Sequence, residues 1–206
     1  MKHLKVILTL LFVLSIIVVS MVWHLAKLQS ELIESDALRT AKIYSRALDE
    51  FRAVYTSEVV SRVSKHGIEV THDYLMRDNA IPLPATLSMM LGEKIGKRNL
   101  GARSQLYSPY SFPWRKNREK PPFFDFNAKA WDVISTKLNT EYFQFSQQDN
   151  EPVLLYARAD VMKSECVACH NTHPDSPKTD WKVGDIRGVL VVTCQWVPSF
   201  LKLILI

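Results

Sequence analysis

The sequence predicts an α+β protein, in which a long N-terminal helix precedes short helices and an antiparallel sheet. Between Leu28 and Lys65 there is no Pro or Gly, and apolar residues recur at helical spacing. Beyond residue 140, segments rich in β-branched and aromatic residues are separated by turn-forming residues. With 206 residues, 47% of them hydrophobic, the chain has material for one ordinary domain and an appendage.

The N-terminus contains an uncharged, mostly apolar run from Val6 to Ala26, preceded by Lys2 and Lys5. As a helix this run spans about 31 Å, enough for the hydrocarbon core of a bilayer. A cleaved signal peptide usually has a shorter apolar stretch, followed by a cleavage site with small residues. The segment MVWHLAKLQ at the end of this run contains no convincing site of that kind. We therefore predict an uncleaved anchor, with a cleaved signal as the alternative. Because basic residues stay in the cytoplasm, the rest of the chain would lie in the periplasm, held by one span of the inner membrane.

Secondary-structure signals divide the remaining chain. The predicted elements are a long helix over 28–65 that ends at Gly67, a helix that begins at Pro84, an amphipathic helix over 128–138, a hairpin over 142–160 and a strand from 186. The segment over 106–126 is crowded with Pro and aromatic residues, and we predict irregular chain there. The predicted organisation is an anchor over 1–27, a connecting helix over 28–65, a sheet-containing domain over 66–195 and an apolar tail over 196–206.

The charge distribution argues against a nucleic-acid partner. Without Lys2 and Lys5, the chain has 24 basic and 21 acidic residues, a net charge of +3. Nucleic-acid binding needs a clustered basic face, whereas the longest basic run, WRKNREKPP over 114–122, is interrupted by Asn and Glu. The sequence also offers no recognisable acid–base pair, so we do not expect an enzyme.

Cys166, Cys169 and His170 form a C-x-x-C-H motif, in a chain that has only three cysteines. In covalent haem attachment, two thiols add to the two vinyl groups and the following imidazole coordinates the iron. This attachment takes place outside the bacterial cytoplasm, which agrees with the predicted export. We predict one haem c, with thioethers at Cys166 and Cys169 and with His170 as the proximal iron ligand.

Three other chemistries stay open for these thiols. Zinc could use Cys166, Cys169, His170 and His173, but zinc fingers separate their two ligand pairs by about a dozen residues. A thioredoxin-like dithiol needs a helix N-terminus within a βαβ unit, and the predicted layout has none. A structural disulfide across two intervening residues would be strained.

The motif leaves the sixth iron ligand undetermined. The plausible donors are His72, His66, Met162, His173 and Tyr55. His173 and Met162 lie within four residues of the motif, which makes it hard for them to reach the opposite face of a haem. His72 lies well away in the sequence, and we predict it as the distal ligand, with His66 and Met162 as alternatives.

Eight stretches occur in order between about residues 40 and 193: AVYTSEVVSRV, VTHDY, IPLPAT, LYSPYSFPWR, AWDVI, YARADVM, CVACHNTHPDSPKTDWKVGD and IRGVLVV. Together they resemble a bacterial family of extracytoplasmic c-type haem-binding domains with a PAS-like fold. Members of that family stand alone or form the input domain of histidine kinases, diguanylate cyclases and chemoreceptors. The resemblance implies a PAS-like antiparallel sheet over 66–195, with the haem between the sheet and the preceding helices.

The resemblance also implies roles for single residues. Cys166 and Cys169 would hold the haem, His170 would bind the iron, and Lys178, Trp181 and Lys182 would contact the propionates or close the pocket. The tail VPSFLKLILI is too short to span a membrane, unlike the second span of receptor members. The chain is therefore expected to be a stand-alone protein or a receptor without its C-terminal half.

Two functions follow as expectations. In the first, the haem senses redox state or a small gas, and the long helix carries the change to the membrane or to a second copy in a homodimer. In the second, the chain is an anchored electron-transfer cytochrome that exchanges electrons with a redox partner and has no signalling role. A stable six-coordinate iron would favour electron transfer or redox sensing, and an open site would favour gas binding.

Overall fold

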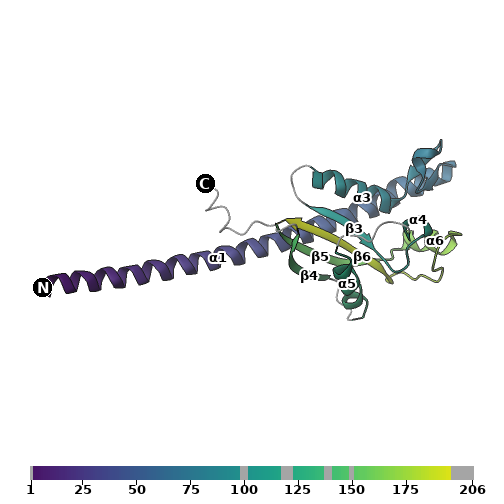
Figure 1. Ribbon diagram of the computed structural model, residues 1–206. Coiled ribbons are helices and arrows are strands. Elements are labelled where there is room, and N and C mark those ends of the chain that lie inside the picture. Colours follow the sequence, from purple (N-terminus) through teal and green to yellow (C-terminus); the bar gives the residue numbers. More distant parts are fainter. Residues whose placement is uncertain (1, 98–101, 117–122, 137–140, 149–150, 196–206) are drawn as a thin grey trace.

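The fold is taken from a computed structural model that describes residues 2–97, 102–116, 123–136, 141–148 and 151–195 (Figure 1). It is α+β, as the sequence predicts: a long N-terminal helix leads into a four-stranded antiparallel sheet with short helices. The helices are α1 (Lys2–Val54), η1 (Tyr55–Val60), α2 (Ser61–Val63), η2 (Ser64–His66), η3 (Tyr74–Met76), α3 (Pro84–Ile95), α4 (Pro113–Lys116), α5 (Phe124–Thr136) and α6 (Ser164–Thr172). The strands are β1 (Glu69–Thr71), β2 (Ala80–Pro82), β3 (Arg103–Tyr107), β4 (Glu141–Gln148), β5 (Glu151–Val161) and β6 (Ile186–Gln195).

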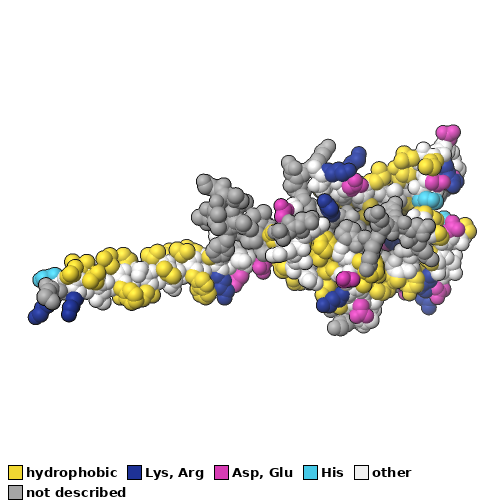
Figure 2. Space-filling model, viewed as in Figure 1, with side chains coloured by type: hydrophobic (Ala, Val, Ile, Leu, Met, Phe, Trp, Pro, Cys, Tyr) yellow, Lys and Arg dark blue, Asp and Glu magenta, His cyan; other side chains and the backbone are white. Residues whose placement is uncertain are grey.

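The N-terminal helix continues without a break in helical backbone from Lys2 to His66. One turn of it, η1, is π-helical. The helix ends at Gly67, whose left-handed backbone (φ 74°) suits glycine. Its first half projects from the body and is covered with apolar side chains (Figure 2). Within the described residues it is the one helix long and apolar enough to cross a membrane, and a signal sequence has the same character.

The sheet has the strand order β3-β6-β5-β4, and its two central strands are apolar on both faces. Alternate residues of a strand point to opposite faces. One face of β5 and β6 packs against α5, and the other packs against α1 (Figure 1). The helix α1 therefore belongs to the core of the domain at one end and projects away from it at the other.

Several elements differ from the prediction, among them the short helix α4, which lies inside the segment predicted as irregular. The chain before Ser108 forms the edge strand β3 along β6, although the sequence predicted irregular chain from residue 106. Its sequence, RSQLY, has weak strand propensity, and the strand depends on hydrogen bonds to β6. Helix α5 begins at Phe124 rather than at residue 128. The predicted tail over 196–206 lies outside the described residues.

Gly188 allows β3 to approach β6 closely. A Cβ at this position would overlap the carbonyl oxygen of Tyr107, which is backbone and cannot move away on its own. We expect Gly188→Ala to lower the free energy of unfolding by about 1–3 kcal/mol, as overpacking does in cores. Urea unfolding followed by circular dichroism measures this change. A loss no larger than that of Gln144→Ala, at an exposed position of β4, would contradict it.

Candidate functional site

The C-x-x-C-H motif lies on α6, a short helix that directly follows β5. The backbone N–H groups of Cys166 and Val167 both donate to the carbonyl of Lys163, which starts the helix. Pro174 lies just beyond its end, where the chain cannot continue as a helix. Because the two thiols are three residues apart on a helix, they lie about one turn apart on the same side.

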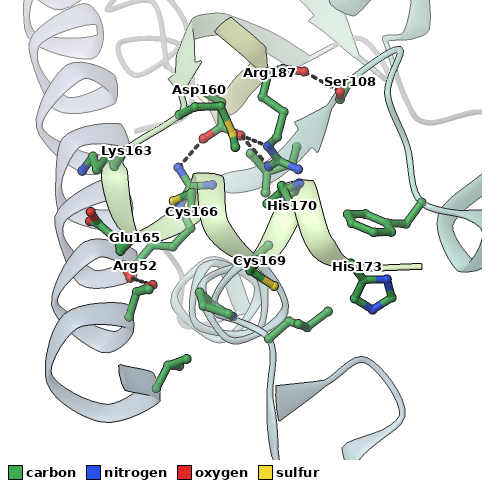
Figure 3. Close-up of a pocket in the computed structure, with 18 of the residues that line it drawn as sticks. Arg52, Ser108, Asp160, Lys163, Glu165, Cys166, Cys169, His170, His173 and Arg187 are labelled. Atoms are coloured by element: carbon green, nitrogen blue, oxygen red, sulfur yellow. Dashed lines mark hydrogen bonds and ion pairs between the residues drawn. The ribbon is translucent and has the colours of Figure 1, made fainter. Parts of the chain in front are cut away.

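A cavity of about 280 Å³ lies beside α6, with a volume close to the lower limit of small-molecule sites. Cys166, Cys169, His170 and His173 all line it (Figure 3). Its other walls come from α1 and η1, from the start of α3, from residues 106–115 and from the end of β5. The cavity is therefore formed where the long helix, the sheet and the motif helix meet.

Burial changes the acid–base properties of the motif. It raises the pKa of the Cys166 and Cys169 thiols, and neither cysteine forms a disulfide. Burial, followed by the positive charge of Arg187, lowers the pKa of His170 to about 4. At neutral pH the imidazole is therefore uncharged and has a free nitrogen lone pair, the form that binds metals.

Next to the motif, two arginines hold one buried carboxylate. Asp160, at the end of β5, is only 6% exposed. Its Oδ1 accepts a hydrogen bond from Arg52 Nη2 at 2.7 Å, and its Oδ2 accepts from Arg187 Nη2 at 2.5 Å (Figure 3). Burial alone would raise the pKa of Asp160, but the two guanidiniums outweigh burial and lower the pKa to about 2. We call Arg52, Asp160 and Arg187 the ion cluster.

A second carboxylate connects α1 to the start of the motif helix. Asp49 Oδ1 accepts from Arg52 Nη2 at 2.9 Å, and Asp49 Oδ2 lies 3.4 Å from Lys163 Nζ. Asp49, Arg52 and Lys163 all line the cavity. Sequence analysis did not identify these charges as part of the site. A usable signal is the presence of charged residues in a largely apolar segment, such as Arg158 and Asp160 in VLLYARADV.

Aromatic rings form the wall near His173. Phe112 lies 5.3 Å from His170 and 5.2 Å from His173, measured between ring centroids, and it stacks on Trp114 at 4.5 Å. Trp114 in turn stacks on His72, with centroids 4.2 Å apart and planes 4° from parallel. Phe112 and Trp114 line the cavity, whereas His72 is not among the described lining residues. The predicted distal ligand thus contacts the cavity wall through Trp114, and its role stays a prediction.

The other predicted site residues have varied positions. Met162 lines the cavity and is 2% exposed, but it belongs to the same segment as the motif. His66 ends η2 and is exposed, away from the described lining. Tyr55 donates from its hydroxyl to the carbonyl of Pro82 at 3.0 Å.

The predicted pocket residues Lys178, Trp181 and Lys182 are not among the described residues that line the cavity. Trp181 is buried, and its backbone N–H and carbonyl both bond to the side chain of Asn171. Lys178 pairs with Asp180, and its Nζ lies 4.8 Å from the centroid of the Trp181 ring. The backbone N–H of Lys182 donates to Asp185 at 2.8 Å. Contacts of Lys178, Trp181 and Lys182 with a haem stay predictions.

One comparison with known proteins gives a match. The family model described as Tll0287-like, Tll0287, matches residues 29–194, which include α6 and all of the sheet except the last residue of β6. No curated protein and no solved structure matches the chain significantly. Because the family model covers most of its length, the chain belongs to the Tll0287-like family.

Proposed function

We propose that the chain is a membrane-anchored c-type haem protein whose haem senses redox state or a small gas. The observation that carries this proposal is that Cys166, Cys169 and His170 all line one cavity. In the proposed arrangement α1 holds the protein in the inner membrane, and the domain lies in the periplasm. The apolar N-terminal half of α1 supports the membrane part of the proposal.

The residues at the cavity fit a haem. Two free thiols one helical turn apart suit the two vinyl groups, and the adjacent imidazole is neutral and able to bind iron. Aliphatic and aromatic side chains, among them Val60, Leu83 and Phe112, line the walls. A sheet with helices on both faces is compatible with the PAS-like fold implied by the resemblance.

Each group of residues has a distinct proposed role. The two cysteines hold the haem, and His170 fixes its orientation by binding from the side of α6. When bound, the haem supplies an iron that takes up one electron or binds a small gas. The aliphatic and aromatic walls exclude water from the iron, which makes nearby charges count for more. We also propose that the protein does not catalyse a reaction.

The sensor function is favoured over simple electron transfer because one helix connects the cavity to the membrane segment. Arg52, Ala53 and Thr56 of this helix line the cavity. The outer face of the helix carries three exposed apolar residues, Leu32, Ile43 and Val54. They are spaced 11 residues apart, which is three helical turns, so they lie on the same side of the helix. This face would allow a second copy to pack alongside in a homodimer. An anchored electron carrier with a redox partner remains the alternative function.

Absorption spectra test the proposed function. The full chain is produced in a host that matures c-type cytochromes, purified in detergent, and measured in ferric, ferrous and ferrous-plus-CO forms. Thioether haem with a CO-sensitive spectrum would support gas sensing, and thioether haem that ignores CO would support redox sensing or electron transfer. Absence of thioether haem would contradict the proposal and return the motif to the zinc and dithiol interpretations.

His72→Ala tests the predicted distal ligand. Because loss of an iron-binding imidazole changes the ligand field of the iron, we expect this variant to shift the Soret band relative to the wild type. His66→Ala tests the alternative ligand in the same way, and Lys65→Ala, at the neighbouring exposed position, is the control. An unchanged Soret band in His72→Ala would contradict the assignment and leave His66 and Met162 as the candidate ligands.

A further inference from the structure

We propose that the ion cluster of Arg52, Asp160 and Arg187 is an electrostatic link between the haem iron and helix α1. The inference rests on the proposed function, because it requires a haem at Cys166, Cys169 and His170. It adds two statements about that site. The cluster sets the reduction potential of the iron, and the charge of the iron acts back on α1 through Arg52.

The cluster lies at the right place for this role. Its three residues line the same cavity as His170, and Figure 3 shows Arg187 reaching from β6 toward the motif helix. The charges of Arg187 and Asp160 both act on the His170 imidazole. All three side chains are largely buried, with 13%, 7% and 15% of the Arg52, Asp160 and Arg187 side chains exposed. Solvent and salt therefore screen them much less than surface charges.

Reduction of the iron supplies the physical coupling. One electron from a donor protein, or from dithionite in the experiment, lowers the charge of the iron by one. A nearby buried carboxylate disfavours the added electron, and a nearby guanidinium favours it. Removing the charge of Asp160 should therefore make the potential more positive, and removing that of Arg187 should make it more negative.

Arg52 transmits the effect to the long helix. Its guanidinium bridges Asp160 and Asp49, and its carbonyl accepts a hydrogen bond from the Thr56 hydroxyl at 2.7 Å. Thr56 belongs to the π-helical turn η1, which begins three residues after Arg52. A π-helical turn within an α-helix is a rare feature that often marks a functional position. A change in the electrostatic force on Arg52 therefore acts next to η1, the turn of the N-terminal helix whose hydrogen-bond register is irregular.

The coupling must be reciprocal. If the redox state of the iron biases the position of Arg52, then the state of Arg52 must bias the potential of the iron by the same free energy. The reduction potential and the protection of η1 against hydrogen exchange are thus two measurements of one link. The reduction potential tests the link in variants of the cluster, and hydrogen exchange tests it in the wild-type protein.

The experiment is a redox titration of the full-length holoprotein and four variants. We expect Asp160→Asn to shift the potential to more positive values and Arg187→Gln to shift it to more negative values. Arg187→Lys, which keeps the charge, should stay close to the wild type. Glu141→Gln is the matched control, because Glu141 also accepts from a lysine of α1 (Lys42 at 2.7 Å) but does not line the cavity.

Hydrogen exchange of the wild type keeps the test decisive if a cluster variant does not fold. We expect the amides of η1 to exchange at different rates in the ferric and ferrous forms. Three results would overturn the inference. The first is a shift in the potential of the cluster variants no larger than that of Glu141→Gln, and the second is a shift of the same sign for Asp160→Asn and Arg187→Gln. The third is identical hydrogen exchange of η1 in the ferric and ferrous forms. Each of these results requires covalent haem, so failure of the proposed function would be seen separately, as its absence.

Discussion

Cys166→Ser combined with Cys169→Ser is expected to abolish covalent haem while leaving the protein in the membrane. A serine hydroxyl does not form the thioether that a thiol forms, and both thiols of the cavity are removed. The proposed anchor is the first half of α1, far from α6 in the chain. Haem staining after denaturing electrophoresis, together with membrane fractionation, measures both parts of the prediction.

Cys194→Ser provides the matched control. Cys194 is buried in β6, where it packs with Ala41 and Leu154 rather than lining the cavity beside α6. Burial also raises the pKa of its thiol to about 11, so it is the least reactive of the three cysteines. We expect this variant to keep covalent haem. Covalent haem in the double variant, or its loss in Cys194→Ser alone, would be incompatible with attachment at the motif.

Asp160→Ala is expected to be the most destabilising single substitution that we propose. It leaves the largely buried guanidiniums of Arg52 and Arg187 without their shared carboxylate. Breaking a buried ion pair in this way costs about 3–5 kcal/mol. Urea unfolding at neutral pH measures the loss. A change below that of Gly188→Ala would show that water or other groups compensate the two arginines.

The pH dependence of this effect has a definite sign. The pKa of Asp160 is about 2 in the folded protein, compared with about 3.9 for an unfolded aspartate. The stabilisation is therefore fully present above about pH 4 and is lost as the pH falls toward 2, by about 2–3 kcal/mol in total. We expect the stability difference between the wild type and Asp160→Ala to shrink over this range. A difference that is constant with pH would contradict the low pKa of Asp160.

The parts of the fold predicted from sequence are those encoded locally. The long helix follows from a stretch without Pro or Gly, and the central strands follow from the apolar runs of β5 and β6. The C-x-x-C-H motif is likewise visible as a string of residues. In each of these cases neighbouring residues alone carry the signal.

The parts that sequence analysis missed depend on residues far apart in the chain. β3 forms because β6 offers it hydrogen bonds, although its own sequence has little strand propensity. Arg52 and Asp160 are 108 positions apart, and neither reveals its partner without the fold. His72 is similar, because its stacking on Trp114 depends on how residues 106–115 lie against the β1 region. The proposed haem-attachment residues are therefore a local prediction, while their electrostatic environment required the structure.

The most direct test of the central claim is the intact mass of the full chain, purified from a host that matures c-type cytochromes and measured after denaturation and solvent extraction. Because thioether bonds survive this treatment, we expect a mass that exceeds that of the same chain carrying Cys166→Ser and Cys169→Ser by one haem, after correction for the two substitutions. A wild-type mass equal to that of the polypeptide alone, in a host that matures another c-type cytochrome in parallel, would contradict covalent haem attachment.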